Sequence, residues 1–264
     1  MVLVIAFAAI CGVAFGERPL VSGSDPNLAA SGQEHVKPSG LQIGGGVLVT
    51  GRPYKGIDSR VIGIPFIMYE GKDWSIKGPR FDYKLSRQGP FTVKGLLRLR
   101  TEGYDEDDSS ALRGMDDREV TLDAGLSFAY RRRWGTVRFE ALTDTLGKNK
   151  GQELALSFSK PIYAPCNFKK LFIAPFAGAE WRTTSLNDYY YGVRPNEATA
   201  NRPPYKASSD ANIFIGMTCN YSLNKDTSIF AMIKNTWLGD EITDSPIVDK
   251  DYAISVVAGL VYNF

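Results

Sequence analysis

The feature that most constrains the fold is an alternation of apolar and polar residues that recurs from about residue 41 to the C-terminus. Within the segment 119–130, Leu126 and Phe128 stand at even positions, whereas Asp123 and Ser127 stand at odd positions. Successive side chains of a β-strand point to opposite faces, so this period predicts strands that have one apolar and one polar face. The chain is therefore predicted to be all-β.

Three properties favour a transmembrane barrel over a soluble sandwich, which also alternates. The predicted strands run about 10–14 residues, longer than the usual 5–6 and suited to a tilted membrane crossing. Their polar face carries charged and small residues, and their apolar face is aliphatic with aromatic residues toward the ends, as in outer-membrane barrels. The final segment places alternate residues from Tyr252 to Phe264 on one apolar face. We predict a transmembrane antiparallel β-barrel in the bacterial outer membrane, with Phe264 as the signal for the barrel-assembly machinery.

The number of strands is left open between ten and twelve, because bacterial single-chain barrels have even numbers of strands. In the segment 73–86 the apolar phase changes at Gly78 and Pro79, which indicates a bulge or a break into two pieces. A second possibility is that 41–50 is not a full strand. Twelve strands are preferred. The eleven candidate segments are 41–50, 60–70, 73–86, 91–102, 118–131, 134–145, 150–160, 171–182, 209–222, 225–238 and 251–264.

The N-terminal region differs from the rest of the chain. Residues 2–16 carry no charge and are too few to span a bilayer as a helix, for which about 20 are needed. Ala14 and Gly16 provide the small residues that signal peptidase requires, so 1–16 is predicted to be a signal peptide. Residues 17–40 are rich in Gly, Pro and Ser and are predicted to form a flexible periplasmic segment ahead of the barrel, 41–264.

Composition excludes several classes of function. A net charge of +2 argues against a nucleic-acid-binding protein. The single histidine, His35, lies in the N-terminal segment, so neither a multi-histidine metal site nor a serine-histidine catalytic centre is available. We expect no enzymatic activity, no cofactor and no metal.

Charged residues on the predicted inner face have two interpretations. They make the lumen selective for anions, or they pair with one another inside a narrow or filled lumen, which is the simpler account. The residues concerned are Lys94, Arg98, Arg100, Asp123, Arg138 and Glu140.

Two long predicted external loops carry motifs that resemble the MipA/OmpV family of outer-membrane barrels, which is named for a murein-transglycosylase-interacting protein. The matching loop residues are Tyr190, Tyr191, Gly192, Glu197, Pro204 and Tyr205 in the first, and Gly239, Asp240, Asp244, Ser245 and Pro246 in the second. The resemblance implies a barrel without catalysis that takes part in peptidoglycan remodelling, as a partner of a murein transglycosylase or synthase. The motif residues are expected to shape the loops. A small-solute pore and a surface adhesin that acts through its external loops are the alternatives.

A periplasmic partner needs a surface on the side of the short turns. The connection 161–170 combines aromatic residues with a basic end, a composition that suits a contact site, so Tyr163 and Phe168 are the candidate contacts. The competing interpretation places both rings in the interfacial aromatic belt. The other expected partners are membrane lipid and lipopolysaccharide.

Overall fold

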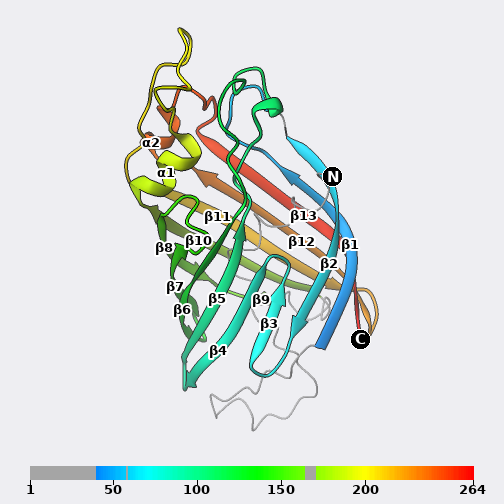
Figure 1. Ribbon diagram of the computed structural model, residues 1–264. Coiled ribbons are helices and arrows are strands. Elements are labelled where there is room, and N and C mark those ends of the chain that lie inside the picture. The colour runs from blue at the N-terminus through cyan, green and yellow to red at the C-terminus, as the bar shows by residue number, and fades with distance from the viewer. Residues whose placement is uncertain (1–39, 58, 164–170) are drawn as a thin grey trace.

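The alternating segments form the wall of a closed antiparallel barrel in the computed structural model (Figure 1). The structure describes residues 40–57, 59–163 and 171–264. The predicted signal peptide and all but the last residue of the predicted segment 17–40 therefore lie outside the described residues. The strands are β1 (Gly40–Thr50), β2 (Arg60–Glu70), β3 (Trp74–Lys77), β4 (Arg80–Gln88), β5 (Phe91–Arg100), β6 (Thr121–Arg132), β7 (Gly135–Asp144), β8 (Gln152–Ser159), β9 (Ile162–Tyr163), β10 (Leu171–Arg182), β11 (Asp210–Ser222), β12 (Thr227–Trp237) and β13 (Tyr252–Asn263).

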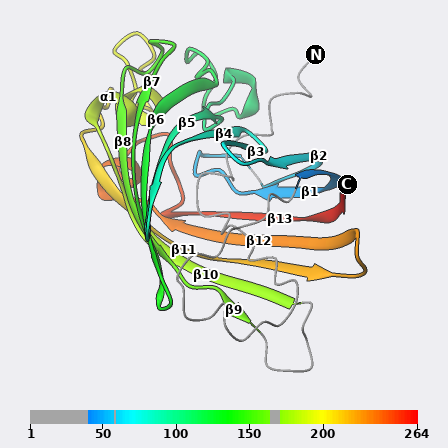
Figure 2. The ribbon, with the colours of Figure 1, turned by 90° about the horizontal axis from the view of Figure 1, so that it is seen from below.

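The wall has twelve strand positions, which confirms the preferred number. β9 does not add a position, because β8 and β9 both pair with β10, β9 near the end where β10 begins. The ring closes where β10 pairs with β11 and where β13 pairs with β1, and Figure 2 shows the last two side by side. The segment 73–86 breaks into β3 and β4 at Gly78 and Pro79, and 41–50 is a full strand that starts one residue earlier.

Side chains alternate between lipid and lumen along each strand. In β6, Leu126 and Phe128 are 42% and 43% exposed, whereas Asp123 and Ser127 are buried. The same alternation holds in β13, where Ile254 and Leu260 point outward and Val257 and Val261 point inward. The apolar residues of the sequence pattern thus form the lipid-facing surface, because a membrane barrel must present apolar side chains to hydrocarbon.

Aromatic side chains mark both edges of the apolar surface. At the end that carries the C-terminus, the ring centroid of Trp134 lies 6.1 Å from that of Tyr130 and 5.9 Å from that of Phe158. The ring centroids of Tyr262 and Phe264 are 4.9 Å apart. At the opposite end, Trp237 and Tyr252 are paired neighbours on β12 and β13. Girdles of this kind sit at the two membrane–water interfaces.

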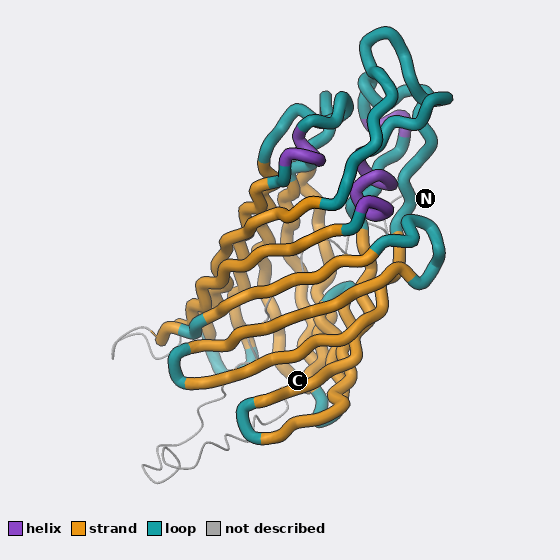
Figure 3. Tube along the Cα trace, turned by 90° about the vertical axis from the view of Figure 1, so that its left-hand side faces the viewer, coloured by secondary structure: helices purple, strands orange, loops and turns teal. Residues whose placement is uncertain are grey.

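The connections at the two ends of the barrel differ in length. The loops 51–59, 101–120, 145–151, 183–209 and 238–251 gather at one end, together with the helices α1 (Thr184–Tyr191) and α2 (Asp240–Thr243) (Figure 3). Short turns such as 133–134 and 223–226 occupy the other end. We assign the loop end to the cell exterior and the turn end to the periplasm, following the usual asymmetry of these barrels.

Among the described residues, no helix is long and apolar enough to cross a membrane, including the short 3-10 helix Glu106–Asp108.

Candidate functional site

The charged half of the lumen is formed by inward side chains of β4 to β8 and β10. Arg98 and Arg100 of β5 each contact both Asp123 of β6 and Glu153 of β8, at 2.7–3.0 Å. Arg100, Asp123 and Glu153 are buried and Arg98 is mostly buried, so their charges are balanced mainly inside the wall rather than by solvent. A buried charge needs a partner and further hydrogen bonds to offset its desolvation.

Further pairs extend this network toward both ends. Toward the turn end, at mid-height of β7, Arg80 contacts Glu140 at 2.7 Å and Asp82 at 2.6 Å, and Lys94 lies 3.8 Å from Asp82. Near the loop end, Arg182 contacts Glu180 and also Glu102 on the loop after β5. We refer to the whole set as the charge ladder: Arg80, Asp82, Lys94, Arg98, Arg100, Asp123, Glu140, Glu153, Glu180 and Arg182.

The structure therefore brings five of the six sequence-predicted lumen charges into the ladder. Arg138, the sixth, borders a small recess beside Arg80, Asp82 and Lys94. Sequence reasoning missed Arg80, because it stands directly after the break between β3 and β4 that obscured the alternation. Its position two residues before Asp82, on the same face of β4, was the available signal.

The other half of the lumen is apolar, which the sequence pattern did not predict. The ring centroids of Phe66 and Phe230 lie 6.0 Å apart, and those of Phe176 and Phe214 lie 6.4 Å apart. All four rings are buried in the lumen, where they project from β2, β10, β11 and β12. In these strands both faces are apolar, so the alternation in polarity is weak. The apolar lumen cluster contains Leu48, Ile64, Phe66, Phe176, Phe214, Phe230, Met232, Val257 and Val261.

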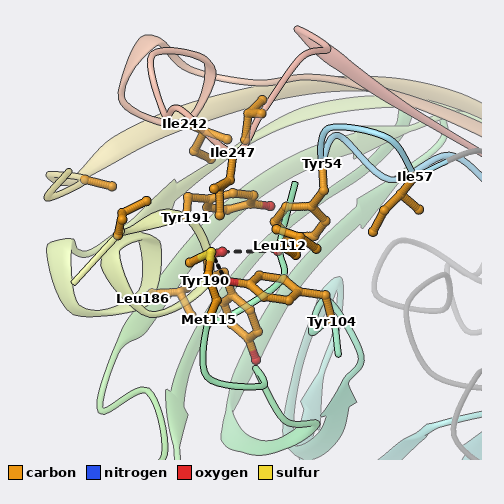
Figure 4. Packing of buried hydrophobic residues seen from close by; sticks show 13 residues of the cluster. Tyr54, Ile57, Tyr104, Leu112, Met115, Leu186, Tyr190, Tyr191, Ile242 and Ile247 are labelled. Carbon is orange, nitrogen blue, oxygen red and sulfur yellow. Dashed lines mark hydrogen bonds between the residues drawn. The ribbon is translucent and has the colours of Figure 1, made fainter. Parts of the chain in front are cut away.

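External loops from distant parts of the chain pack on one buried core over the barrel mouth (Figure 4). The ring of Tyr54 lies edge-on to Tyr104 at 4.8 Å and stacks on Tyr191 at 5.6 Å. Its hydroxyl donates to the backbone carbonyls of Glu102 and Tyr190. Burial raises the pKa of the Tyr54 hydroxyl well above its ordinary value, so it remains a donor. The members of this cap cluster are Tyr54, Ile57, Tyr104, Leu112, Met115, Leu186, Tyr190, Tyr191, Val193, Ala207, Ile242, Ile247 and Val248.

Glu197, one of the motif residues, ties two loops together. Its carboxylate accepts from the Arg118 guanidinium at 2.9 and 3.0 Å and from the backbone N–H groups of Asp116 and Arg194. Burial raises the pKa of this carboxyl, but the hydrogen bonds from Arg194 and Asp116 and the charge of Arg118 outweigh it, so the pKa lies below its ordinary value. Glu197 is thus ionised and fully partnered.

The motif residues of the two longest loops meet each other. Ser245 is buried and its hydroxyl donates to the backbone carbonyl of Tyr191 at 2.6 Å. The Tyr205 hydroxyl donates to the Glu241 carbonyl at 2.9 Å, beside α2. Gly239 packs so closely against Asp210 that a Cβ would lie 2.2 Å from its carboxylate.

The remaining motif residues lie around these contacts. The N–H of Gly192 donates to the Asp188 carbonyl and ends α1. Asp240 opens α2, and the Asp244 N–H donates back to the Asp240 carbonyl. Asp240, Asp244 and Pro204 are exposed, and Pro246 is partly buried next to Ser245.

A cavity of about 430 Å³ lies between the cap cluster and the barrel interior. Its lining includes Ile62 of β2, Glu102 and Tyr104 after β5, Arg182 of β10 and Lys234 of β12. Burial raises the pKa of Glu102, but the guanidiniums of Arg182 and Arg100 lower it further, so Glu102 is charged. The cavity therefore offers both signs of charge beside apolar side chains.

The predicted periplasmic contacts are only partly described. The backbone of Tyr163 pairs with Phe172 in β9, and Phe168 lies outside the described residues. Within the described ranges, no group of histidine, cysteine, aspartate and glutamate side chains is arranged to hold a metal ion.

Comparison with known proteins supplies the family. The family model for MltA-interacting protein MipA matches residues 43–264. The MltA-interacting protein of Escherichia coli strain K12 is 30% identical over 85% of this chain and 90% of its own length. Outer membrane protein OmpV of Vibrio cholerae is 34% identical over 74% of this chain and 76% of its own length.

One solved structure, the NanC porin, covers 85% of this chain and all of its own, with 8% identity and a TM-score of 0.45. The family resemblance noted in the loop motifs is confirmed by the family model, which spans the barrel and all its loops. The chain is an outer-membrane protein, and it belongs to the MltA-interacting protein MipA family.

Proposed function

We propose that this protein is a non-enzymatic outer-membrane barrel that binds a periplasmic peptidoglycan-remodelling enzyme and holds it at the membrane. The observation that carries the proposal is the 30% identity, over most of both chains, with a protein named for its interaction with MltA. The relatives are named as interacting or outer-membrane proteins. This fits a role in binding rather than in catalysis.

The internal chemistry of the barrel supports this proposal. The charge ladder pairs its carboxylates and guanidiniums with one another, and the motif residues Tyr190, Tyr191 and Ser245 of the external loops contact one another or pack in the cap cluster. The groups with the strongest chemistry thus stabilise the barrel itself. The surface for a partner is expected at the turn end, where the candidate contacts Tyr163 and Phe168 and the segment 17–40 belong in sequence.

Binding of purified protein in nanodiscs to a lytic transglycosylase from the same cell tests the proposal. Replacing Tyr163 and Phe168 with alanine and removing residues 17–39 is expected to weaken binding, with heat-modifiable gel migration reporting an intact barrel. The matched control changes the exposed loop-end residues Asn201 and Lys206 to alanine. Equal loss of binding in both sets, or no binding by the wild-type protein, contradicts the proposal.

A small-solute pore is the second candidate, because the cavity of about 430 Å³ adjoins Glu102, Arg182 and Lys234. Planar-bilayer recordings separate the two. Open-channel steps whose ion selectivity shifts in Arg98→Glu favour the pore, since Arg98 lies in the charge ladder below this cavity.

A further inference from the structure

One sector of the periplasmic end carries positive charge without carboxylates. The segments 83–97, 124–139 and 154–163 supply the periplasmic parts of the neighbouring strands β4 to β8, together with the turns that join them. These segments contain eight lysine and arginine residues and no aspartate or glutamate. The nearest carboxylates along the chain, Asp82 and Glu140, both contact Arg80 of the charge ladder.

The other described turns at this end have balanced charges. The β2–β3 turn places Lys72 beside Asp73, and the β11–β12 turn places Lys225 beside Asp226. By contrast, the β6–β7 turn follows directly on the run Arg131, Arg132 and Arg133. The excess of positive charge is therefore a property of this sector and not of the whole rim.

Arg132 lies on the outer face of the barrel, at the level of the aromatic girdle. Its Nε donates to the Tyr130 hydroxyl at 2.8 Å, and its guanidinium carbon lies 5.2 Å from the centre of the Tyr130 ring. The Tyr130 ring in turn lies 4.8 Å from the ring of Phe91, which is 57% exposed on the lipid-facing side. Neither contact brings a negative charge, so Arg132 presents a cation at the membrane surface.

Aromatic rings next to Arg132 form an apolar platform. Trp134 and Phe158 stack with their ring centroids 5.9 Å apart and 19° between their planes, and they are 49% and 40% exposed. Gly135 makes room for this stack, because a Cβ there would lie 2.4 Å from the Phe158 ring. The exposed Lys160 follows Phe158 by two residues. Cations thus border rings where headgroups meet hydrocarbon.

These features indicate the charge of the ligand. The leaflet at the turn end is the periplasmic one, which consists of phospholipids. Guanidinium groups suit a phosphate, to which they donate paired N–H groups, and the bond from Arg132 to Tyr130 uses only Nε. The ammonium group of a zwitterionic head needs a carboxylate, which the three segments lack. Each cation near the surface favours an anionic lipid by about fivefold.

We propose that the β6–β7 turn binds an anionic phospholipid of the periplasmic leaflet at a defined site. The phosphate contacts Arg132 and Arg133, and Lys160 adds a third positive charge. The acyl chains start over Trp134 and Phe158 and continue along the lipid-facing surface of the strands. We call these five residues the turn site.

Fluorescence quenching by brominated lipid tests this proposal at Trp134. The full-length protein carries Trp74→Phe, Trp181→Phe and Trp237→Phe, so that Trp134 is the sole fluorophore of its kind. It is reconstituted in vesicles of phosphatidylethanolamine with a minor fraction of phosphatidylglycerol. In paired samples, bromine near the ester is carried either by the phosphatidylglycerol or by the same molar fraction of phosphatidylethanolamine. Phosphatidylglycerol is expected to quench more strongly, and less so at high salt. Equal quenching by the two lipids overturns the proposal.

Charge variants link the preference to the turn site. Arg132→Gln and Arg133→Gln are each expected to lower the binding constant of phosphatidylglycerol relative to phosphatidylethanolamine by about fivefold. The matched control is Lys225→Gln on the β11–β12 turn, which is expected to leave it unchanged. A preference that persists in both arginine variants, or that falls equally in the control, refutes the site. If Arg132→Gln fails to assemble, Arg133→Gln combined with Lys160→Gln gives the same test.

A second single-tryptophan protein separates a defined site from general attraction to the membrane surface. It keeps only Trp74, which is 40% exposed near the balanced β2–β3 turn. The two brominated lipids are expected to quench Trp74 almost equally, and a preference as large as that at Trp134 refutes a defined site. An acidic protein surface is the other possible ligand. Weaker binding of the transglycosylase by Arg132→Gln, without any lipid preference at Trp134, assigns the turn to that protein and overturns the proposal.

Discussion

Replacing Glu197 with glutamine is expected to open the loop cap without unfolding the barrel. Glu197 is 2% exposed and its pair with Arg118 is buried on both sides, so the change leaves a guanidinium without its countercharge. Removing one partner of a buried pair costs about 3–5 kcal/mol. Glutamine keeps one oxygen that accepts hydrogen bonds, which places the expected loss near 3 kcal/mol, more than a hundredfold in the opening equilibrium.

Hydrogen–deuterium exchange of the protein in detergent micelles measures this opening. Peptides that cover 105–118 and 193–205 are expected to exchange much faster in Glu197→Gln, and peptides of β11 and β12 are expected to be unchanged. The matched control is Glu119→Gln, whose pair with Lys148 is exposed on both sides and screened by solvent, so its loss is expected to leave the opening nearly unchanged. Unchanged exchange in Glu197→Gln, or equal effects of the two changes, refutes the reasoning.

The pKa of Glu197 gives the same prediction a pH dependence. Because its folded pKa lies below the ordinary value, its contribution to the cap is complete above the ordinary carboxyl pKa and is lost as the pH falls through the folded one. After correction for intrinsic exchange rates, opening of the wild-type cap is expected to increase in this acidic range. The Glu197→Gln protein is expected to lack this increase.

Three further predictions concern the wall. Deleting Phe264, which is 72% exposed and donates its N–H to the Leu41 carbonyl, is expected to lower the fraction of heat-modifiable protein in the outer membrane; normal assembly contradicts its role as a terminal signal. Gly259→Ala places a Cβ 2.3 Å from the Phe66 ring, so we expect it to lower the free energy of unfolding by about 1–3 kcal/mol in urea titrations. The control is Gly95→Ala, whose Cβ meets only Leu85 at 3.8 Å and is expected to be nearly neutral. Arg100→Met leaves Asp123 and Glu153 short of a partner and is expected to cost about 3–5 kcal/mol in the same titrations; a loss below 1 kcal/mol shows that the charge ladder is hydrated.

The sequence predicted the wall well because a membrane barrel imposes one simple rule on every strand. Lipid selects apolar residues at alternate positions, so β6 and β13 were identified close to their bounds from polarity alone. The break between β3 and β4 was visible as a change of phase at Gly78 and Pro79. The even strand number followed from that break.

The lumen and the loops were harder to predict, for different physical reasons. Phe66, Phe176 and Phe214 are apolar residues on the inner face, so the inner and lipid faces of these strands do not differ in polarity and the sequence cannot separate them. Helix α1 lies in a stretch that the sequence predicts only as a long loop, because its residues are ordered by contacts with Tyr54 and Ser245 from loops far away in the chain. Such contacts leave no periodic trace in the sequence.

The charge ladder has a consequence for how the strands find their register. A shift of one residue in a strand turns every inward side chain to the outside. For β5 such a shift places Arg98 and Arg100 in lipid, where an arginine costs up to about 2–4 kcal/mol at the bilayer centre and less toward the interface at which β5 ends. It also deprives Asp123 and Glu153, on β6 and β8, of their partners. Misaligned intermediates of assembly are therefore penalised on three strands at once, and the correctly aligned wall is separated from them by a wide energy gap before the external loops have packed.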